Sequence, residues 1–237
     1  MKLESPFRPR GEHIEIELPG ARAVFTTRRG GHSSGAYASL NLGRLTDDDP
    51  ELVKRNRASV EADLGLPLAL ARQVHGKRVL MVTGPSEPPL PEADGQATTS
   101  RAMAPTVLTA DCLPIALAAD GAVAMVHAGW RGLAAGVIDE GVSALQAAGG
   151  RGPISAAIGP GAGPCCYEVG EEVLSVFQEP GPNLDLKAIA RARLERAGAA
   201  EVHDVGLCTI CSPPELFFSH RRDRGVTGRQ AGIVWRT

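Results

Sequence analysis

The dipeptide Asp120-Gly121 stands between two apolar runs, and it constrains the fold more than any other feature of the sequence. A tight type I′ turn needs positive φ at both central positions, and Asp-Gly is one of the residue pairs that accept this conformation best. Strictly apolar flanks indicate strands that are buried in a core. The sequence therefore predicts a β-hairpin centred on this pair, in which Pro114 lies opposite His127.

This register places two metal-binding side chains on one face of the hairpin. Side chains alternate along a strand, so Cys112 and His127 become diagonal neighbours with backbone positions about 7–8 Å apart. A four-residue loop keeps this arrangement, whereas a three-residue loop would put them on opposite faces. His75, in an extended segment before Gly76, is the best candidate for a third ligand.

His75, Cys112 and His127 would make a three-ligand zinc set with a vacant fourth position, which is typical of catalytic zinc sites. From the spacing alone, a buried cysteine and an ordinary core histidine explain the pattern equally well. The residues that follow favour a functional site. Gly129-Trp130-Arg131-Gly132 leads into a predicted helix, so free backbone N–H groups and the Arg131 guanidinium could together hold an anion beside the metal.

Asp111 directly precedes Cys112 and is a candidate for two roles. It could accept a hydrogen bond from a ligating imidazole, or it could accept a proton during catalysis. The alternative is a carboxylate that only caps a turn.

Helical and strand patterns are interspersed along the chain, which predicts the α/β class in a single domain spanning residues 1–237. We expect helices at 50–64, 133–148, 171–178 and 186–197, and strands at 13–18, 23–27, 154–158, 202–205 and 231–235.

Charge and hydropathy exclude several classes of protein. A net charge of −2 and a pI near 6.3 give no cationic field for a phosphate backbone, so we expect no nucleic-acid partner. The first twenty residues lack the apolar core of a signal peptide, and no apolar run approaches the roughly 20 residues that span a bilayer. We therefore expect a cytoplasmic protein that does not enter the membrane.

Five cysteines are an odd number, which argues against a fully paired disulfide framework. Adjacent Cys165 and Cys166 are expected to point in different directions, so joint chelation of one metal ion is not expected. Cys208 and Cys211 have the spacing of a zinc ribbon or a redox pair, but no second pair with this spacing completes a ribbon. We assign these four cysteines no role.

Short motifs spread over nearly the whole chain match those of one known family. They are Thr27-Arg28-Arg29-Gly30-Gly31, Ser39-Leu40-Asn41-Leu42-Gly43, Gln73-Val74-His75-Gly76, Thr109-Ala110-Asp111-Cys112-Leu113-Pro114, His127-Ala128-Gly129-Trp130-Arg131-Gly132, Cys165-Cys166-Tyr167-Glu168-Val169-Gly170, and Phe217-Phe218-Ser219-His220-Arg221-Arg222-Asp223 with Thr227-Gly228-Arg229. The chain resembles the laccase-domain family, also called the polyphenol oxidoreductase or purine nucleoside phosphorylase family. The resemblance implies mixed β-sheets layered between helices, an α/β/β/α-like sandwich, with zinc held by His75, Cys112 and His127. His220 departs from the tyrosine expected at its position.

The resemblance implies zinc-dependent phosphorolysis of a purine nucleoside: adenosine, inosine, guanosine or methylthioadenosine reacts with phosphate to give free base and a ribose 1-phosphate. Adenosine deamination is a second activity credited to such proteins. The implied partners are a small nucleoside and phosphate, bound by a monomer or a small homo-oligomer. The candidate catalytic residues are Asp111, Arg131 and Glu168, and the candidate substrate-binding residues are Arg28, Arg44, Tyr167, Phe217 and Arg229.

Other functions remain as alternatives. A multicopper laccase needs several histidines in His-x-His pairs, but this chain has six histidines and no such pair. Copper in place of zinc in a His/Cys site could still give a weak polyphenol oxidase. Cys112 could instead be a thiolate nucleophile paired with a histidine, in an amidase or hydrolase that acts on a cell-wall precursor. A fourth protein ligand would indicate a structural zinc in a binding module.

Overall fold

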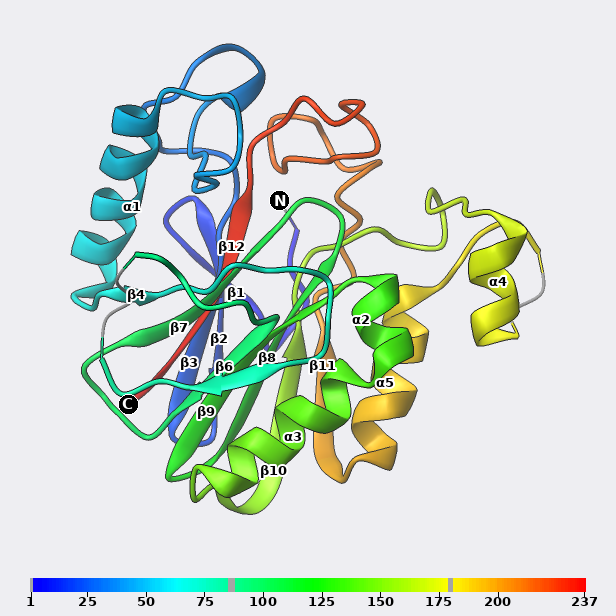
Figure 1. Cartoon of the computed structure of the whole chain (residues 1–237). Helices are drawn as coiled ribbons and strands as arrows, with labels where there is room; N and C mark the ends of the chain where they lie inside the picture. The colour runs from blue at the N-terminus through cyan, green and yellow to red at the C-terminus, as the bar shows by residue number, and fades with distance from the viewer. Residues whose placement is uncertain (1, 85–87, 179–180) are drawn as a thin grey trace.

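The computed structural model describes residues 2–84, 88–178 and 181–237 (Figure 1). These residues form two mixed six-stranded sheets and five α-helices, which confirms the predicted α/β class. The first sheet contains, in spatial order, β1 (Arg8–Arg10), β2 (His13–Leu18), β3 (Ala21–Phe25), β12 (Gln230–Arg236), β7 (Ala104–Thr109) and β4 (Leu68–Ala69). The second contains β11 (Ala199–Asp204), β10 (Arg151–Ile158), β8 (Leu113–Asp120), β9 (Ala122–Ala128), β6 (Gly95–Thr98) and β5 (Val79–Met81).

Helices cover the outer face of each sheet (Figure 1). The helices are α1 (Pro50–Leu64), α2 (Trp130–Ala135), α3 (Val137–Ala147), α4 (Glu171–Phe177) and α5 (Leu186–Arg196). One buried cluster joins α1 to the first sheet, a second lies between the two sheets, and a third joins α3 and α5 to the second sheet. The layer order is therefore α/β/β/α, as the family resemblance implies.

The predicted hairpin is confirmed, with its register. β8 pairs with β9 in antiparallel fashion, and Pro114 lies opposite His127. Gly121 has φ of +89°, but Asp120 is not among the residues with positive φ, so the two-residue turn is tight without being the expected type I′. Because these two strands lie inside the second sheet, between helices and the first sheet, every residue of both except Asp120 is buried. This explains why the two runs are apolar on both faces.

The structure corrects the helix expected at 133–148. Two helices occupy this region: α2 begins at Trp130, and Gly136 at φ +91° separates it from α3. The left-handed conformation of Gly136 ends the first helix, and a hydrophobic pattern alone does not reveal such a break. Four short strands, β1, β4, β6 and β7, were not expected from the sequence. In the described residues, no helix is both long enough and apolar enough to cross a membrane.

Substitution of the turn glycine tests the importance of the hairpin for stability. Because Gly121 has a positive φ and an added Cβ would lie 3.3 Å from the Gly149 carbonyl oxygen, Gly121→Ala should lower the free energy of unfolding by about 1–2 kcal/mol. Gly84→Ala is the control, because Gly84 has open space around its Cβ position. Denaturant unfolding measures both variants, and equal stability of the two would contradict the prediction.

Candidate metal centre

The structure brings His75, Cys112 and His127 together. One nitrogen of each imidazole and the Cys112 sulfur all lie within 4.8 Å of one another. His127 lies on β9, Cys112 directly precedes β8, and His75 lies in the segment between β4 and β5. The two imidazole rings meet edge to face, with centroids 4.9 Å apart. Within the described residues, this group of ligand atoms has three members.

The backbone around the group is shaped to direct these side chains inward. His75 has φ of +60° and Asp111, next to Cys112, has φ of +89°. A residue other than glycine in this region costs of order 1–3 kcal/mol, and such strain is often found at functional sites. A Cβ on Gly129 would lie 2.8 Å from the Cys112 sulfur and 3.3 Å from a carbon of the His75 ring. Glycine at this position therefore leaves room for two of the three candidate ligands.

One buried carboxylate positions both histidines. Asp94 accepts a hydrogen bond from His127 Nδ1 at 2.8 Å. It also accepts from the main-chain N–H groups of Val74, His75 and Gly76, at 3.2, 2.9 and 2.7 Å. The Asp94 side chain thus fixes the turn that carries His75 and leaves Nε2 as the nitrogen of His127 that contacts Cys112.

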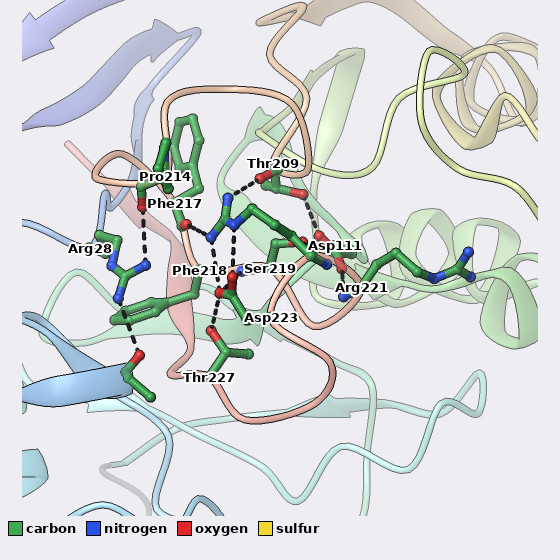
Figure 2. Close-up of polar contacts among 12 residues, drawn as sticks. Arg28, Asp111, Thr209, Pro214, Phe217, Phe218, Ser219, Arg221, Asp223 and Thr227 are labelled. Carbon is green, nitrogen blue, oxygen red and sulfur yellow. Dashed lines mark hydrogen bonds and ion pairs between the residues drawn. The ribbon is translucent and has the colours of Figure 1, made fainter.

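Sequence reasoning missed Asp94 and offered Asp111 for the imidazole contact, as one of two candidate roles. The pairing of β6 with β9 is the feature that would have identified Asp94, because its register puts Gly95 opposite Val126 and hence Asp94 beside His127. β6 is only four residues long and was not expected, so this register could not be used. Asp111 instead accepts hydrogen bonds from Thr209 Oγ1 and from the main-chain N–H of Arg221, both at 2.7 Å (Figure 2).

Electrostatics favour a thiolate in this group. Burial acts to raise the pKa of Cys112, but the charge of His127 and hydrogen bonds from both histidines outweigh it and lower the pKa to about 6. Burial acts to lower the pKa of His127, but the Cys112 thiolate and Asp94 raise it to about 9. Burial likewise opposes the ionised form of Asp94, yet His127 and the N–H donors hold the pKa of Asp94 below its usual range.

This donor set fits zinc. Imidazole nitrogen and thiolate sulfur are the donors that zinc prefers, and zinc sites with three protein ligands keep a position open for water or substrate. The hydrogen bond from His127 to Asp94 supplies the outer support that ligating histidines commonly have. Three side chains and a supporting carboxylate are therefore ready to hold a divalent ion.

Arginines and a tyrosine surround the group. Burial, together with the charges of Cys112 and Asp111, raises the pKa of Tyr167 to about 12, while Arg221 and Arg131 oppose this rise. Burial lowers the pKa of Arg229, and the charges of Cys112 and Asp111 act in the opposite direction. Tyr167 and Arg229 therefore lie within electrostatic reach of the candidate ligand Cys112, and Arg131 and Arg221 lie within electrostatic reach of Tyr167. The Arg221 guanidinium lies 5.3 Å from the centre of the Tyr167 ring, and Arg131 stacks on Trp130 at 4.2 Å.

Two predicted substrate contacts make structural contacts within the fold, and burial rules out the predicted role of Phe217. Arg28 donates hydrogen bonds to the carbonyl oxygens of Ala36, Ala38 and Pro214 and stacks on Phe218, so its guanidinium ties loops together (Figure 2). Phe217 is completely buried in the cluster between the sheets and has no face open to a purine. Tyr167 is left as the aromatic candidate for a base pocket.

The remaining candidates stay predictions. Arg44 is exposed in the loop before α1, and no described contact joins it to the metal centre. Glu168 is exposed, and its main-chain oxygen accepts a hydrogen bond from the Arg221 side chain at 2.5 Å.

The structure corrects the expectation that Cys165 and Cys166 diverge. The sulfur atoms of Cys165, Cys166, Cys208 and Cys211 all lie within 4.8 Å of one another. The alternation of side chains holds for extended chain, but the adjacent pair lies in a turn in which the N–H groups of Cys166 and Tyr167 both donate to the Gly163 carbonyl. Neighbouring side chains in such a turn can converge.

A two-sheet α/β fold that gathers two histidines and a cysteine defines a class of candidate metalloproteins. The chain belongs to the family described as multi-copper polyphenol oxidoreductase laccase, which matches residues 22–237. It is 42 % identical to a purine nucleoside phosphorylase of Xylella fastidiosa, over 92 % of this chain and 93 % of the relative. It is 40 % identical to another of Streptomyces coelicolor, over 91 % and 96 %. The crystal structure of YlmD from Geobacillus stearothermophilus matches with a TM-score of 0.89 at 34 % identity, over 97 % of this chain and 98 % of that one.

Removal of the Asp94 charge should weaken metal binding. In Asp94→Asn, the hydrogen bond that orients His127 loses its ionised acceptor, so zinc affinity should fall 10- to 100-fold. Asp120→Asn is the matched control, because Asp120 lies at the exposed far end of the same hairpin. Competition with a fluorescent zinc chelator measures both. Unchanged affinity in Asp94→Asn would contradict the orienting role.

The reactivity of Cys112 in metal-stripped protein should depend on pH in an unusual way. Only the thiolate reacts with iodoacetamide, so the rate should rise with a midpoint at pH of about 6, below the value of about 8.5 for a free cysteine. His127→Ala removes the stabilising charge and should move the midpoint upward. Peptide mass spectrometry separates Cys112 from the other cysteines. A midpoint in the wild-type protein at or above that of free cysteine would contradict the ion pair.

Proposed function

We propose that this protein is a zinc-dependent purine nucleoside phosphorylase. It would convert adenosine, inosine, guanosine or methylthioadenosine and phosphate into free base and a ribose 1-phosphate, and deaminate adenosine at the same site. The observation that carries the proposal is the group of His75, Cys112 and His127, with the Arg229 guanidinium within electrostatic reach of Cys112. The names of the relatives supply the substrate class.

His75, Cys112 and His127 would hold the zinc ion. Bound there with an open position, zinc supplies a positive charge that polarises an oxygen of the substrate. The chain's own contribution is a rigid set of ligands, because Asp94 fixes both histidines and Gly129 leaves space for the sulfur.

Arg131 and Arg229 would bind phosphate. In phosphorolysis the bond from C1′ to the base nitrogen breaks, a bond from C1′ to a phosphate oxygen forms, and the base takes up a proton. Phosphate must approach the sugar while carrying negative charge, and guanidinium groups offset that charge and orient the oxygens in pairs. Asp111 contributes indirectly by fixing the main chain at Arg221.

Tyr167 would form one wall of the base pocket. Its ring is partly buried and lies against Arg221, an arrangement suited to stacking a flat purine. Because the pKa of its phenol is raised to about 12, Tyr167 stays neutral at ordinary pH and can donate a hydrogen bond to a base or sugar oxygen.

Asp111 and Glu168 are the two carboxylates proposed for proton transfer, to the leaving base or during deamination. Asp111 precedes the ligand Cys112, and Glu168 follows Tyr167. Asp111→Asn and Glu168→Gln distinguish them, since the variant that lacks the group that transfers the proton should lose the most activity.

The central experiment uses pure protein of known metal content with inosine, adenosine and methylthioadenosine, with and without phosphate. Chromatography should show free base and ribose 1-phosphate only when phosphate is present, and His127→Ala should reduce base release at least a hundredfold. Base release that does not need phosphate would reject phosphorolysis.

The phosphate contact has a separate test. Arg131→Ala should raise KM for phosphate at least tenfold, because a charged hydrogen-bond partner of the anion is worth about 1.5–3 kcal/mol. Arg151→Ala is the control, since Arg151 is exposed at the start of β10, beside the hairpin turn. Equal KM values in the two variants would remove Arg131 from the phosphate site.

A Cys-His hydrolase is the second candidate, and the ion pair of Cys112 and His127 is the observation that favours it. An activated thiolate could attack an amide carbon of a cell-wall precursor. Absence of product from every nucleoside, together with amide cleavage by metal-free protein, would favour this candidate over phosphorolysis.

A further inference from the structure

We propose that Cys165, Cys166, Cys208 and Cys211 bind a second zinc ion in a closed site of four thiolates. This site is separate from the group of His75, Cys112 and His127, and it has no position left for a substrate. Its role would be to join two loops that flank the first metal centre.

The geometry of the four sulfur atoms supports the proposal. All four lie within 4.8 Å of one another, and the Cys165 and Cys211 sulfurs are 3.4 Å apart. Zinc with thiolate bonds of about 2.3 Å in a tetrahedron has sulfur-to-sulfur edges of about 3.8 Å. Small side-chain rotations therefore suffice to form the site. A cluster of several iron atoms would occupy the centre and hold the sulfurs further apart.

The main chain around Cys208 is already arranged for a metal-bound thiolate. The N–H of Gly163 donates to the Cys208 sulfur at 3.3 Å, and the N–H groups of Ile210 and Cys211 also donate to it. Main-chain donors of this kind offset the negative charge that builds up on sulfur when four thiolates share one divalent ion. The two-residue spacing between Cys208 and Cys211 produces two of these three contacts.

The two cysteine-bearing loops are joined by backbone pairing as well. Gly161 forms a parallel bridge with Cys208, and Thr209 donates its N–H to the Gly161 carbonyl at 3.0 Å. The four cysteines therefore stand on a fixed scaffold. A donor set of four sulfurs selects a soft ion such as zinc over calcium or magnesium.

The site lies beside residues of the first metal centre. Tyr167 directly follows Cys166, and Thr209, between Cys208 and Cys211, donates a hydrogen bond to Asp111. A zinc ion held by all four cysteines would therefore fix both the position of Tyr167, the proposed wall of the base pocket, and the hydrogen bond from Thr209 to Asp111. It would stabilise the loops without taking part in the reaction.

Metal analysis of the full chain, purified in reducing buffer, tests the proposal. We expect two zinc ions per chain in the wild-type protein. Cys112→Ser should keep one, and the double variant Cys208→Ser with Cys211→Ser should also keep one. A single zinc in the wild-type protein that is lost in Cys112→Ser would overturn the proposal.

A spectroscopic measurement leaves the four cysteines intact, so it does not depend on the folding of the double variant. X-ray absorption at the zinc edge of Cys112→Ser should show a shell of sulfur only, at about 2.3 Å. A shell that contains nitrogen or oxygen, iron in place of zinc, or a Cys165–Cys211 disulfide found by thiol counting would each contradict a four-thiolate zinc site. Failure here leaves phosphorolysis untouched, because nucleoside cleavage is assigned to the other centre.

Discussion

The hydrogen bonds of one buried carboxylate hold the candidate metal centre together. Asp94 is completely buried and accepts from three consecutive N–H groups in the turn of His75 and from the ring of His127. A buried charge is costly unless it is fully hydrogen-bonded, and these partners compensate it. Because the same carboxylate reaches a loop and a strand, a shift in either one would disturb both histidines. The fixed positions of two of the three candidate ligands thus depend on a residue that binds no metal itself.

The hairpin is the part of the site that the sequence predicts well. Asp120-Gly121 defines the turn, the turn defines the register, and the register puts Cys112 and His127 on one face. Only local geometry is involved, so the sequence is sufficient. The contact of Asp94 with His127 cannot be predicted in this way. It depends on pairing between β6 and β9, which are distant in the sequence, and β6 has no clear strand pattern of its own.

Two errors show where residue type alone misleads. Phe217 is an aromatic residue in a motif with arginines, which suggests a stacking surface, yet the packing of the two sheets buries it completely. Cys165 and Cys166 were expected to diverge, yet a turn at Gly163 makes their sulfurs converge with those of a loop about forty residues later in the chain. Both outcomes depend on the way distant segments pack, which spacing in a sequence does not encode.

The number and type of donor atoms argue against one of the two chemistries that the family names imply. A multicopper oxidase passes electrons among several copper ions, and most of its ligands are imidazoles. In the described residues, the two groups of candidate ligands contain two histidines and five cysteines, and one group is made of thiols alone. Such a set can supply one centre with an open position and one closed centre. With the proposed zinc ion of fixed charge, the open centre, within electrostatic reach of the Arg229 guanidinium, would position an anion beside a sugar, as phosphorolysis requires.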